Sequence, residues 1–249
     1  MEKIYILDIP VSVVDKQQAK QNIINWMNED KARTVFTPNP EMIMAALKDE
    51  KLKKAMYKAD MIVPDGIGVV WASKYASQRI TERVAGCDLI QEVMKEMAGT
   101  DKRVYFLGGA PTVAEKAAQK MKEKYKGLKV AGVHDGYFNE EQEKKLIEEI
   151  FSLKPDLLLV GLGVPKQEKW IYANRDKLGF KVAVGVGGSF DVLSGNVKRA
   201  PQIFRKLNLE WFYRLITQPT RFKRMLELPK FALKVKKEYK NSKKNKSKI

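Results

Sequence analysis

The stretch P-D-L-L-L-V-G-L-G-V-P-K-Q-E, residues 155–168, shows the pattern that decides the fold. Its short apolar run, Leu157–Val160, ends at a loop that contains two glycines and a proline. Short apolar runs bounded in this way are typical of parallel strands that are buried on both faces. The stretch therefore predicts a buried strand whose carboxyl end runs into a glycine-rich loop.

The same unit, an apolar run followed by a helical pattern, recurs along most of the chain. Capping-box residues predict the starts of two of the helices, at Thr112–Glu115 and at Asn139–Gln142. Repeated strand-then-helix units predict an α/β fold, a Rossmann-like parallel sheet with helices on both faces. The other predicted strands are Thr34–Phe36, Met61–Val63, Val104–Leu107, Lys129–Val133 and Val182–Val186, with an edge strand expected near Ile4–Leu7.

Charge is distributed unevenly along the 249 residues, which carry a net charge of +17. Seventeen Lys and Arg residues but only three acids lie from Lys198 onward, so this part holds +14 of the total. The sequence therefore predicts an α/β core over residues 1–195 and a basic, aromatic-rich helical appendage over residues 196–249. Such a segment seeks phosphate on nucleic acid, on an anionic membrane surface or on a diphosphate substrate.

Cysteine usage and the N-terminus indicate the compartment. Cys87 is the only cysteine, so the chain has no internal disulfide and a reducing environment is favoured. Residues 1–5 lack the charged-then-apolar pattern of a signal peptide, and no apolar run approaches the ~20 residues of a spanning helix. We therefore expect a cytoplasmic protein that crosses no bilayer.

Glycine- and proline-rich loops follow four of the predicted strands, at residues 108–111, 134–138, 161–168 and 185–191. In open α/β sheets, ligands bind outside the carboxyl ends of the strands. Glycines there let backbone N–H groups come close to a ligand, and the following helix N-termini favour anions. These loops predict a nucleotide-type pocket. The candidate ligand contacts in them are Gly108, Gly109, Tyr137 and Gly187.

Several familiar signatures are absent from the sequence. No G-x-G-x-x-G stands in the first strand-to-helix turn and no G-x-x-x-x-G-K-[ST] occurs, which argues against a dinucleotide oxidoreductase and a P-loop enzyme. One cysteine and one histidine, His134, cannot build a zinc site, and no D-x-D pair is available to hold a divalent ion over a diphosphate. We therefore expect neither a metal nor another cofactor.

Asp65 stands in the sequence V-P-D-G, residues 63–66, directly after a predicted strand. Pro-Asp-Gly is ordinary turn chemistry, because proline fixes φ, aspartate bonds its own backbone and glycine accepts a positive φ. The same turn can also present a carboxylate at the end of a strand. Local sequence favours the turn alone and leaves a catalytic aspartate as the second interpretation.

Two further polar stretches are candidates for ligand binding. In T-P-N-P-E-M, residues 37–42, two prolines stiffen a loop that can aim Thr37 and Asn39 at a sugar. The alternative is that Asn39 only closes a turn at the start of a helix. In E-R-V-A-G-C-D, residues 82–88, Arg83 can pair with a phosphate or form a surface ion pair with a neighbouring acid.

The first half of the appendage, L-E-W-F-Y-R-L-I-T-Q-P-T-R-F-K-R-M over residues 209–225, interleaves aromatic residues with arginines. A basic segment with aromatic anchors is typical of an element that lies on a membrane surface. A disordered basic extension is the alternative. The apolar residues of the predicted helical face are Trp211, Phe212, Leu215 and Ile216, and the arginines on the other faces are Arg214, Arg221 and Arg224.

Taken together, these stretches resemble the WecG/TagA/CpsF glycosyltransferases of bacterial surface-polymer synthesis. The resemblance covers about residues 4–228 in family order and is strongest to the wall teichoic acid branch. The motifs that carry it are T-P-N-P-E-M, V-P-D-G-I-G-V-V, E-R-V-A-G-C-D-L, F-L-G-G, P-D-L-L-L-V-G-L-G-V-P-K-Q-E, G-V-G-G-S-F-D-V-L-S-G, and R-A-P-Q followed by L-E-W-F-Y-R-L.

The resemblance implies an inverting, metal-independent transfer of N-acetylmannosamine from UDP-N-acetylmannosamine to undecaprenyl-diphosphate-linked N-acetylglucosamine, with a new β-1,4 bond. It implies that Asp65 is the general base and that the enzyme is peripheral on the inner, anionic face of the cell membrane. It also implies that appendage arginines close over the diphosphate. The pocket residues implied by the resemblance are Thr37, Asn39, Arg83 and Gln167, and the appendage residues are Arg214, Arg221 and Arg224.

Three matters stay open from sequence alone. A family member that uses another UDP-sugar, of N-acetylmannosaminuronic acid or glucose, would fit the same residues. A non-enzymatic nucleic-acid-binding α/β protein could use the basic appendage, but the pocket loops disfavour it and we expect no nucleic-acid partner. The sequence does not determine the oligomeric state, including a homodimer away from the membrane, or whether the appendage acts in cis or in trans.

Overall fold

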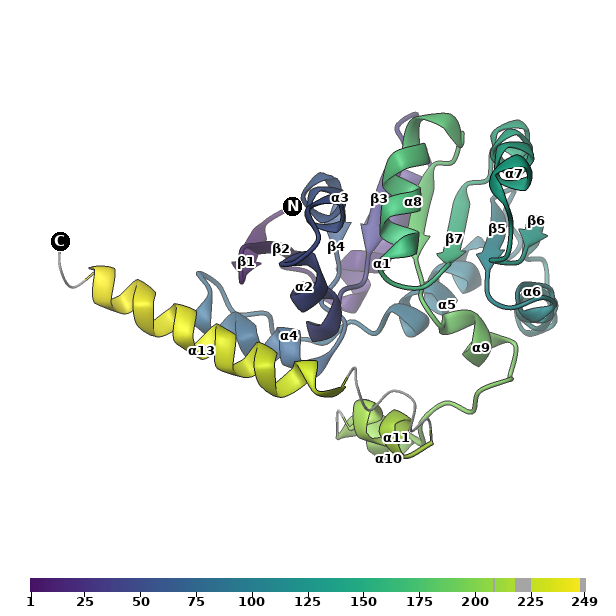
Figure 1. The fold of residues 1–249 in the computed structure, drawn as a ribbon. Coiled ribbons are helices and arrows are strands. Elements are labelled where there is room, and N and C mark those ends of the chain that lie inside the picture. Colours follow the sequence, from purple (N-terminus) through teal and green to yellow (C-terminus); the bar gives the residue numbers. More distant parts are fainter. Residues whose placement is uncertain (208, 218–224, 247–249) are drawn as a thin grey trace.

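A computed structural model describes residues 1–207, 209–217 and 225–246 and has an α/β architecture (Figure 1). Six parallel strands form one sheet in the order β4-β3-β8-β7-β5-β6. All six strands predicted for the parallel sheet are present, so the predicted fold class is confirmed. The strands are β3 (Arg33–Phe36), β4 (Met61–Ile62), β5 (Arg103–Gly108), β6 (Lys129–His134), β7 (Leu157–Gly161) and β8 (Val182–Gly185).

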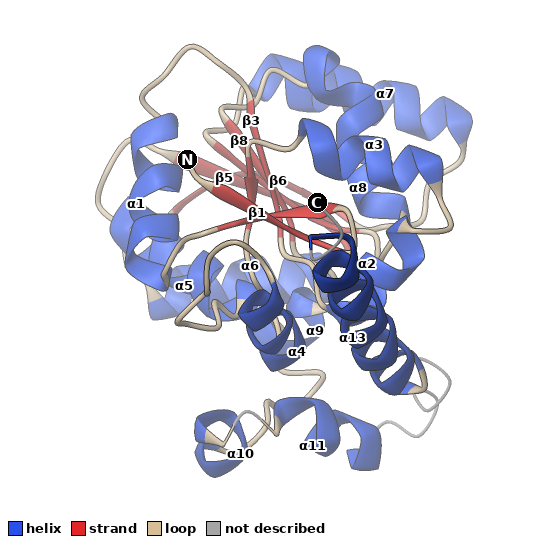
Figure 2. Cartoon of the chain, turned by 90° about the vertical axis from the view of Figure 1, so that its left-hand side faces the viewer, coloured by secondary structure: helices blue, strands red, loops and turns tan. Residues whose placement is uncertain are grey.

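Helices cover both faces of this sheet (Figure 2). One face packs against α1 (Lys16–Trp26), α5 (Gly86–Met97), α6 (Val113–Lys124) and α9 (Ser189–Leu193). The other face packs against α2 (Pro40–Ala46), α3 (Glu50–Lys58), α7 (Glu140–Leu153) and α8 (Lys166–Asn174). Shorter connecting elements are α4 (Ile67–Ala72), η1 (Ser73–Tyr75) and η2 (Arg175–Lys177).

Strand β7 shows why the apolar runs of the sequence are continuous rather than alternating. Leu157 and Leu159 belong to the hydrophobic cluster on one face, whereas Leu158 and Val160 belong to the cluster on the other. All four side chains are fully buried. Because side chains point alternately to the two faces of a strand, a sheet covered on both sides needs an apolar residue at every position.

The strand expected near Ile4–Leu7 exists, but it is not an edge of the main sheet. Strand β1 (Lys3–Ile6) pairs antiparallel with β2 (Ile9–Ser12) in a separate two-stranded sheet. The two residues between the strands, Leu7 and Asp8, have φ values of 51° and 62°, which turn the chain back at once. The hairpin is fixed to the body by the Ser12 hydroxyl, which accepts from the backbone N–H of Ile62 at 3.0 Å.

One of the two predicted capping boxes is confirmed and one is wrong. At the start of α7, the Asn139 side chain accepts from the Gln142 N–H and the Gln142 side chain accepts from the Asn139 N–H. Thr112, before α6, instead has a left-handed backbone with φ of 69° and makes no side-chain cap. A capping residue needs an extended backbone to turn its hydroxyl toward the helix amides, and the tight turn here removes that geometry.

The chain after residue 195 is helical where it is described, as expected. The helices are α10 (Gln202–Lys206), α11 (Glu210–Thr217) and α13 (Glu227–Lys246). In Figures 1 and 2, α10 and α11 lie together beyond the lower end of the body, and α13 runs back along it beside α2 and α4. Phe231 and Val235 of α13 are only 2% and 5% exposed and join the core cluster. The division of the chain at residue 195 stays a prediction.

Among the helices of the described residues, none is long and apolar enough to cross a bilayer.

Candidate active site

All six strands of the sheet run in the same direction, so their carboxyl ends meet at one edge. The loops after the neighbouring strands β3 and β4 carry most of the predicted polar residues, and they are tied to each other. The backbone N–H of Asp65 donates to the carbonyl of Pro38 at 3.2 Å. The stretches T-P-N-P and V-P-D-G, which lie about 26 positions apart in the sequence, therefore form one surface at the carboxyl edge.

Asp65 is held by backbone and side-chain contacts from outside its own turn. Its Oδ2 accepts from the N–H of Gly86 at 3.1 Å, and its Oδ1 lies 3.5 Å from Nη2 of Arg83. The next residue, Gly66, has a φ of 112°, as the predicted turn requires. The side chain of Asp65 is 27% exposed. The turn and the presented carboxylate are thus both present in one loop.

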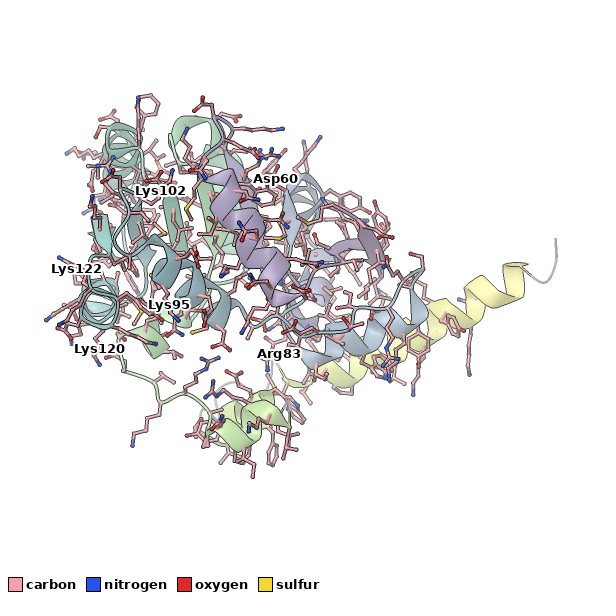
Figure 3. The ribbon with its side chains drawn as sticks, turned by 180° about the vertical axis from the view of Figure 1, so that it is seen from behind. Asp60, Arg83, Lys95, Lys102, Lys120 and Lys122 are labelled. Carbon is pink, nitrogen blue, oxygen red and sulfur yellow. The ribbon has the colours of Figure 1, made fainter. Side chains whose placement is uncertain are left out.

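Arg83 connects the body to the appendage. Its Nη2 donates to Oε2 of Glu210 at 2.9 Å, and its Nε is buried without a hydrogen-bond partner among the described residues. Figure 3 shows Arg83 on the side of the body that faces α10 and α11. Burial works against the charged form, but Asp65 and Glu210 outweigh it and raise the pKa of Arg83 above its ordinary value. Arg83 is therefore a charged group between two carboxylates.

Thr37 locks three loops together. Its hydroxyl donates to the carbonyl of Gly185 at the end of β8, at 3.2 Å. Its side chain also lies against Gly86, where an added Cβ would come within 3.0 Å of the Thr37 methyl carbon. Only glycine fits at position 86 without moving Thr37, and the same glycine supplies the N–H that holds Asp65. The position of the Asp65 carboxylate thus depends on Thr37 through one backbone unit.

Asn39 has the structural role that the sequence left as an alternative. It is the N-cap of α2, and its Oδ1 accepts from the N–H of Met42 at 2.9 Å, with Pro40 in the first helical position. Glu41 lies in the first turn of that helix. One lone pair of the Asn39 oxygen is therefore used by the helix, and the amide nitrogen and the second lone pair remain for contact with a ligand.

Gln167 lies beneath the carboxyl edge rather than on it. Its side chain is 1% exposed, its Oε1 accepts from the N–H of Gly187 at 3.0 Å, and its Nε2 donates to Oε1 of Glu168 at 2.7 Å. Gln167 therefore supports the loop after β8. Gly187 itself has a φ of 52° and no atoms near the place of an added Cβ, so its backbone faces open space.

The remaining predicted glycines and Tyr137 lie toward the other end of the same edge. Gly108 ends β5 with a φ of 132°, and an added Cβ would be 2.5 Å from the Gly161 backbone. Gly109 follows with a φ of 76°, and its carbonyl accepts from the N–H of Gly136 at 2.8 Å. That bond brings the loop of Tyr137, which is 71% exposed, next to the β5 loop.

Two of the three predicted appendage arginines, Arg221 and Arg224, lie outside the described residues. Arg214 belongs to α11, but its side chain is outside the described part of the structure.

Two residues that the sequence reasoning missed, Glu210 and Arg199, lie where the appendage meets the body. Arg199 forms a two-pronged ion pair with Asp88, whose Oδ2 is 2.6 Å from Nη2. Arg199 stands in the motif R-A-P-Q and Glu210 in L-E-W-F-Y-R-L. The signal that could have indicated them is that each is a charged residue within a quoted motif.

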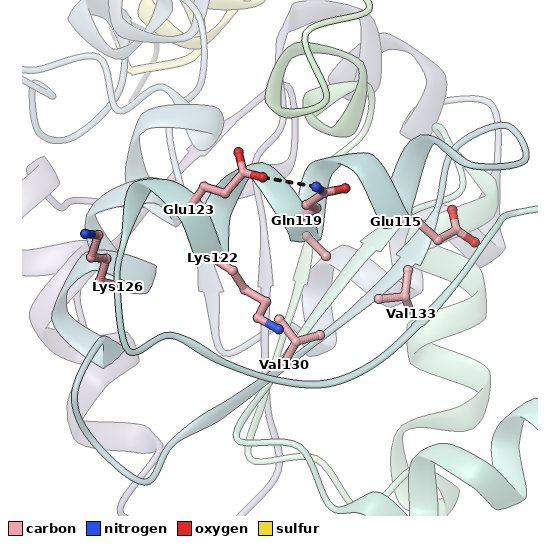
Figure 4. A pocket seen from close by; sticks show the side chains of 8 residues that line it. Glu115, Gln119, Lys122, Glu123, Lys126, Val130 and Val133 are labelled. Carbon is pink, nitrogen blue, oxygen red and sulfur yellow. Dashed lines mark hydrogen bonds between the residues drawn. The ribbon is translucent and has the colours of Figure 1, made fainter.

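A cavity of about 350 Å³ lies at this junction. It is lined by basic side chains and by the acids that pair with them, among them Lys16, Arg83, Asp88, Arg199, Arg205 and Glu210. A larger hollow of about 850 Å³ lies between α6 and β6 (Figure 4). Its lining includes Glu115, Gln119, Lys122 and Val133, and it contains none of the candidate site residues. We therefore place the functional site at the carboxyl edge, next to the smaller cavity.

Metal ligands do not gather at this site in the described part of the chain. No group of three or more His, Cys, Asp or Glu side chains there is arranged to hold a metal ion. The expectation of a reaction without metal stays a prediction.

The fold and this edge define a class: an α/β protein with a polar ligand site at the carboxyl edge of a parallel sheet, the region where such sheets bind nucleotides and related ligands. The Glycosyl transferase WecG/TagA/CpsF family matches residues 4–245, and the chain belongs to that family. The resemblance drawn from the motifs is confirmed.

Curated relatives cover nearly the whole chain. It is 41% identical over 220 residues to the N-acetylglucosaminyldiphosphoundecaprenol N-acetyl-beta-D-mannosaminyltransferase of Bacillus subtilis (strain 168), with 88% of this chain and 85% of the relative covered. It is 35% identical over 246 residues to the protein of the same name from Staphylococcus aureus (strain MRSA252), with 98% and 96% covered. The protein is therefore an enzyme, a glycosyltransferase.

Proposed function

We propose that this glycosyltransferase moves N-acetylmannosamine from UDP-N-acetylmannosamine to undecaprenyl-diphosphate-linked N-acetylglucosamine, in the synthesis of the wall teichoic acid linkage unit. The names of relatives at 35–41% identity contain this acceptor and this transferred sugar. A nucleotide donor is supported by the glycine loops at the carboxyl edge, where Gly187 has a left-handed backbone that faces open space.

The observation that carries the proposal is the placement of the Asp65 carboxylate. It is partly exposed at the carboxyl edge and fixed by Gly86 and Arg83, so it can accept a proton in a defined direction. In the proposed reaction the acceptor hydroxyl gives its proton to Asp65 as its oxygen attacks the anomeric carbon of the donor. The new β-1,4 carbon–oxygen bond forms as the bond to the diphosphate breaks, and UDP leaves with the electron pair. Attack opposite the leaving group inverts the anomeric centre.

Stabilisation of the leaving diphosphate needs positive charge. General-base help contributes roughly 10²–10⁴-fold to such a reaction, and the remaining stabilisation is electrostatic. We propose that Arg83, which lies at the site, and the appendage residues Arg214, Arg221 and Arg224 supply this charge without a metal ion. Arg83 carries this charge firmly, because Asp65 and Glu210 outweigh its burial and hold its pKa above the ordinary value.

Contact with a membrane surface is supported by apolar side chains on α10 and α11. Ile203 and Leu207 are 63% and 61% exposed, Ile216 is 60% exposed, and the aromatic rings of Trp211 and Phe212 are about 40% exposed. Exposed apolar residues grouped on short helices beside basic side chains are typical of elements that lie in a membrane interface. We propose that this surface, Ile203–Ile216, docks on the inner face of the cell membrane, where the lipid acceptor resides.

The transferred sugar has an alternative. Transfer from UDP-N-acetylmannosaminuronic acid or UDP-glucose would use the same site residues. The homodimer away from the membrane, and action of the appendage in cis or in trans, stay predictions.

A donor panel tests the proposed function. UDP release is measured with a soluble lipid-diphosphate N-acetylglucosamine analogue as acceptor and each UDP-sugar in turn, with and without a chelator. We expect acceptor-dependent UDP release with UDP-N-acetylmannosamine, unchanged by the chelator. Release that occurs only with another donor would assign the enzyme to a different polysaccharide, and loss of release on chelation would remove the metal-independent mechanism.

A further inference from the structure

The first turn of α8 contains a buried carboxyl group that the proposed mechanism does not use. Glu168 is 0% exposed, and its Oε2 has no hydrogen-bond partner among the described residues. Its Oε1 accepts from Nε2 of Gln167 at 2.7 Å. Burial of a carboxyl group without an ion pair costs free energy of folding, which indicates that Glu168 has a role at this position.

The contact between Glu168 and Gln167 fixes the orientation of an amide. Gln167 offers its Oε1 to the N–H of Gly187 and its Nε2 to the carboxyl oxygen of Glu168. A flipped amide would set its NH₂ group against the Gly187 N–H, so the bond that holds Gly187 would be lost, and its oxygen would face Oε1 of Glu168, which is an acceptor as long as the acid proton is absent or on Oε2. An acceptor at position 168 therefore selects the one amide orientation that can hold Gly187.

The space around this chain of bonds is closed. Gly185, in β8, faces the two side chains, and an added Cβ there would lie 2.9 Å from Nε2 of Gln167 and 3.4 Å from Oε1 of Glu168. The carbonyl of Gly185 in turn accepts from the Thr37 hydroxyl. The Glu168–Gln167 pair therefore abuts the strand end to which both Gly187 and Thr37 are attached.

We propose that Glu168 is a positioning residue of the transferase: it orients the Gln167 amide, and through that amide it sets the backbone of the Gly187 loop at the carboxyl edge. This role rests on the proposed function only in that the loop is taken to contact the donor. Burial raises the pKa of Glu168 to about 7, so the carboxyl can stay neutral in the interior while its carbonyl oxygen still accepts from Gln167.

Amide hydrogen exchange over residues 185–191 tests the positioning directly and does not depend on activity. We expect Glu168→Leu, which removes the acceptor but keeps the volume, to speed exchange at Gly187 by about tenfold or more, as loss of one internal hydrogen bond allows. Glu168→Gln, which retains a carbonyl oxygen, should restore most of the protection. Unchanged exchange in Glu168→Leu would overturn the proposal.

A matched control separates positioning from general loosening of α8. Asn174 is 8% exposed in the same helix, and its side chain donates to the carbonyl of Trp170. Asn174→Ala should lower stability without changing exchange at Gly187, and equal loosening in both variants would reduce Glu168 to a structural residue. If Glu168→Leu fails to fold, Glu168→Met removes the same carboxyl acceptor with a more adaptable apolar side chain and must give the same faster exchange.

Steady-state kinetics test whether the position of the Gly187 loop affects the use of the UDP-sugar. With the active donor, Glu168→Leu should raise KM for the UDP-sugar about tenfold and change kcat by less than about threefold, and Glu168→Gln should recover KM. Absence of transfer by the wild-type enzyme with every donor would refute the proposed function and leave the exchange result to decide the positioning. A raised exchange rate with unchanged KM would overturn the link between this loop and the donor.

Discussion

Arg83 of the body donates to Glu210 of the appendage, with 2.9 Å between Nη2 and Oε2, across 127 positions of sequence. The same nitrogen lies 3.5 Å from Oδ1 of Asp65. The guanidinium thus joins the proposed base to the first helix turn of α11, and the Glu210 side chain is only 7% exposed. Docking of the appendage and the state of the site are therefore coupled through one arginine.

Glu210→Gln should loosen the docking of α11, because the neutral amide replaces a charged partner of Arg83. We expect a loss of about 1–3 kcal/mol of local stability and clearly faster amide hydrogen exchange over residues 209–217. Glu227→Gln is the matched control, since Glu227 pairs with Lys230 within its own helix, α13. Equal exchange in the wild type and Glu210→Gln would show that the ion pair does not hold the appendage.

Gly86→Ala should damage both stability and the site. The added Cβ would lie 3.0–3.2 Å from three atoms of Thr37, so either Thr37 or the backbone that holds Asp65 must shift. Crowding of this kind costs about 1–3 kcal/mol, which lowers Tm by roughly 2–4 °C per kcal/mol in a chain of this size. Gly188→Ala is the control, because its nearest contact would be an ordinary 3.6 Å. Equal melting curves for Gly86→Ala and the wild type would contradict the packing described here.

The buried carboxyl of Glu168 predicts a pH dependence of stability. Its pKa is raised from 4.5 to about 7 by burial, so between these values the unfolded chain loses a proton that the folded chain keeps. Unfolding then releases a proton, and this group's contribution to stability falls as pH rises, by about 1.4 kcal/mol per pH unit, and levels off above pH 7. Urea unfolding at several pH values should show Glu168→Gln gaining on the wild type across this window. A difference that is constant with pH would contradict the raised pKa.

Substitution of the apolar surface Ile203–Ile216 should weaken membrane binding. Ile216→Glu places a charge where a 60% exposed apolar side chain would enter the interface, and we expect at least a tenfold loss of binding to anionic vesicles in co-sedimentation. Leu233→Glu on α13, at a residue that is 70% exposed but outside this surface, serves as the control. Equal losses in both variants would remove the specific role of α10 and α11.

Deletion of residues 196–249 would not isolate the role of the apolar surface. Phe231 and Val235 are buried against the body, so the truncation would expose part of the core as well as remove the apolar surface. Point substitutions on α10 and α11 avoid this ambiguity.

Local pattern predicted the central strands of the sheet because strands such as β7 and β8 bury both of their faces. The run Leu157–Val160 can be read without knowledge of its neighbours for that reason. The pairing of β1 could not be read in the same way, because its turn at Leu7 and Asp8 uses left-handed residues that carry no glycine or asparagine signal. The capping box predicted at Thr112 was wrong for a similar reason: a threonine side chain suits a helix cap, but the left-handed backbone of Thr112 does not.

Contacts between distant segments set the limit for the site. The motifs indicated Asp65, Thr37 and Arg83, but not that Gly86 lies against Thr37 or that Glu210 reaches Arg83. Nothing local distinguishes such partners, since their separation in the sequence is large. Glu168 was missed for a different reason, because an acid in the first turn of a helix is normally exposed and favoured there by the helix dipole.

The most direct test of the account is the turnover of Asp65→Asn, which removes the base but can keep the bond from the Gly86 N–H. With UDP-N-acetylmannosamine and the soluble acceptor analogue, we predict that kcat falls by roughly 10²–10⁴-fold while affinity for UDP stays within about twofold of the wild type. Turnover close to that of the wild type would contradict the assignment of Asp65 as the general base.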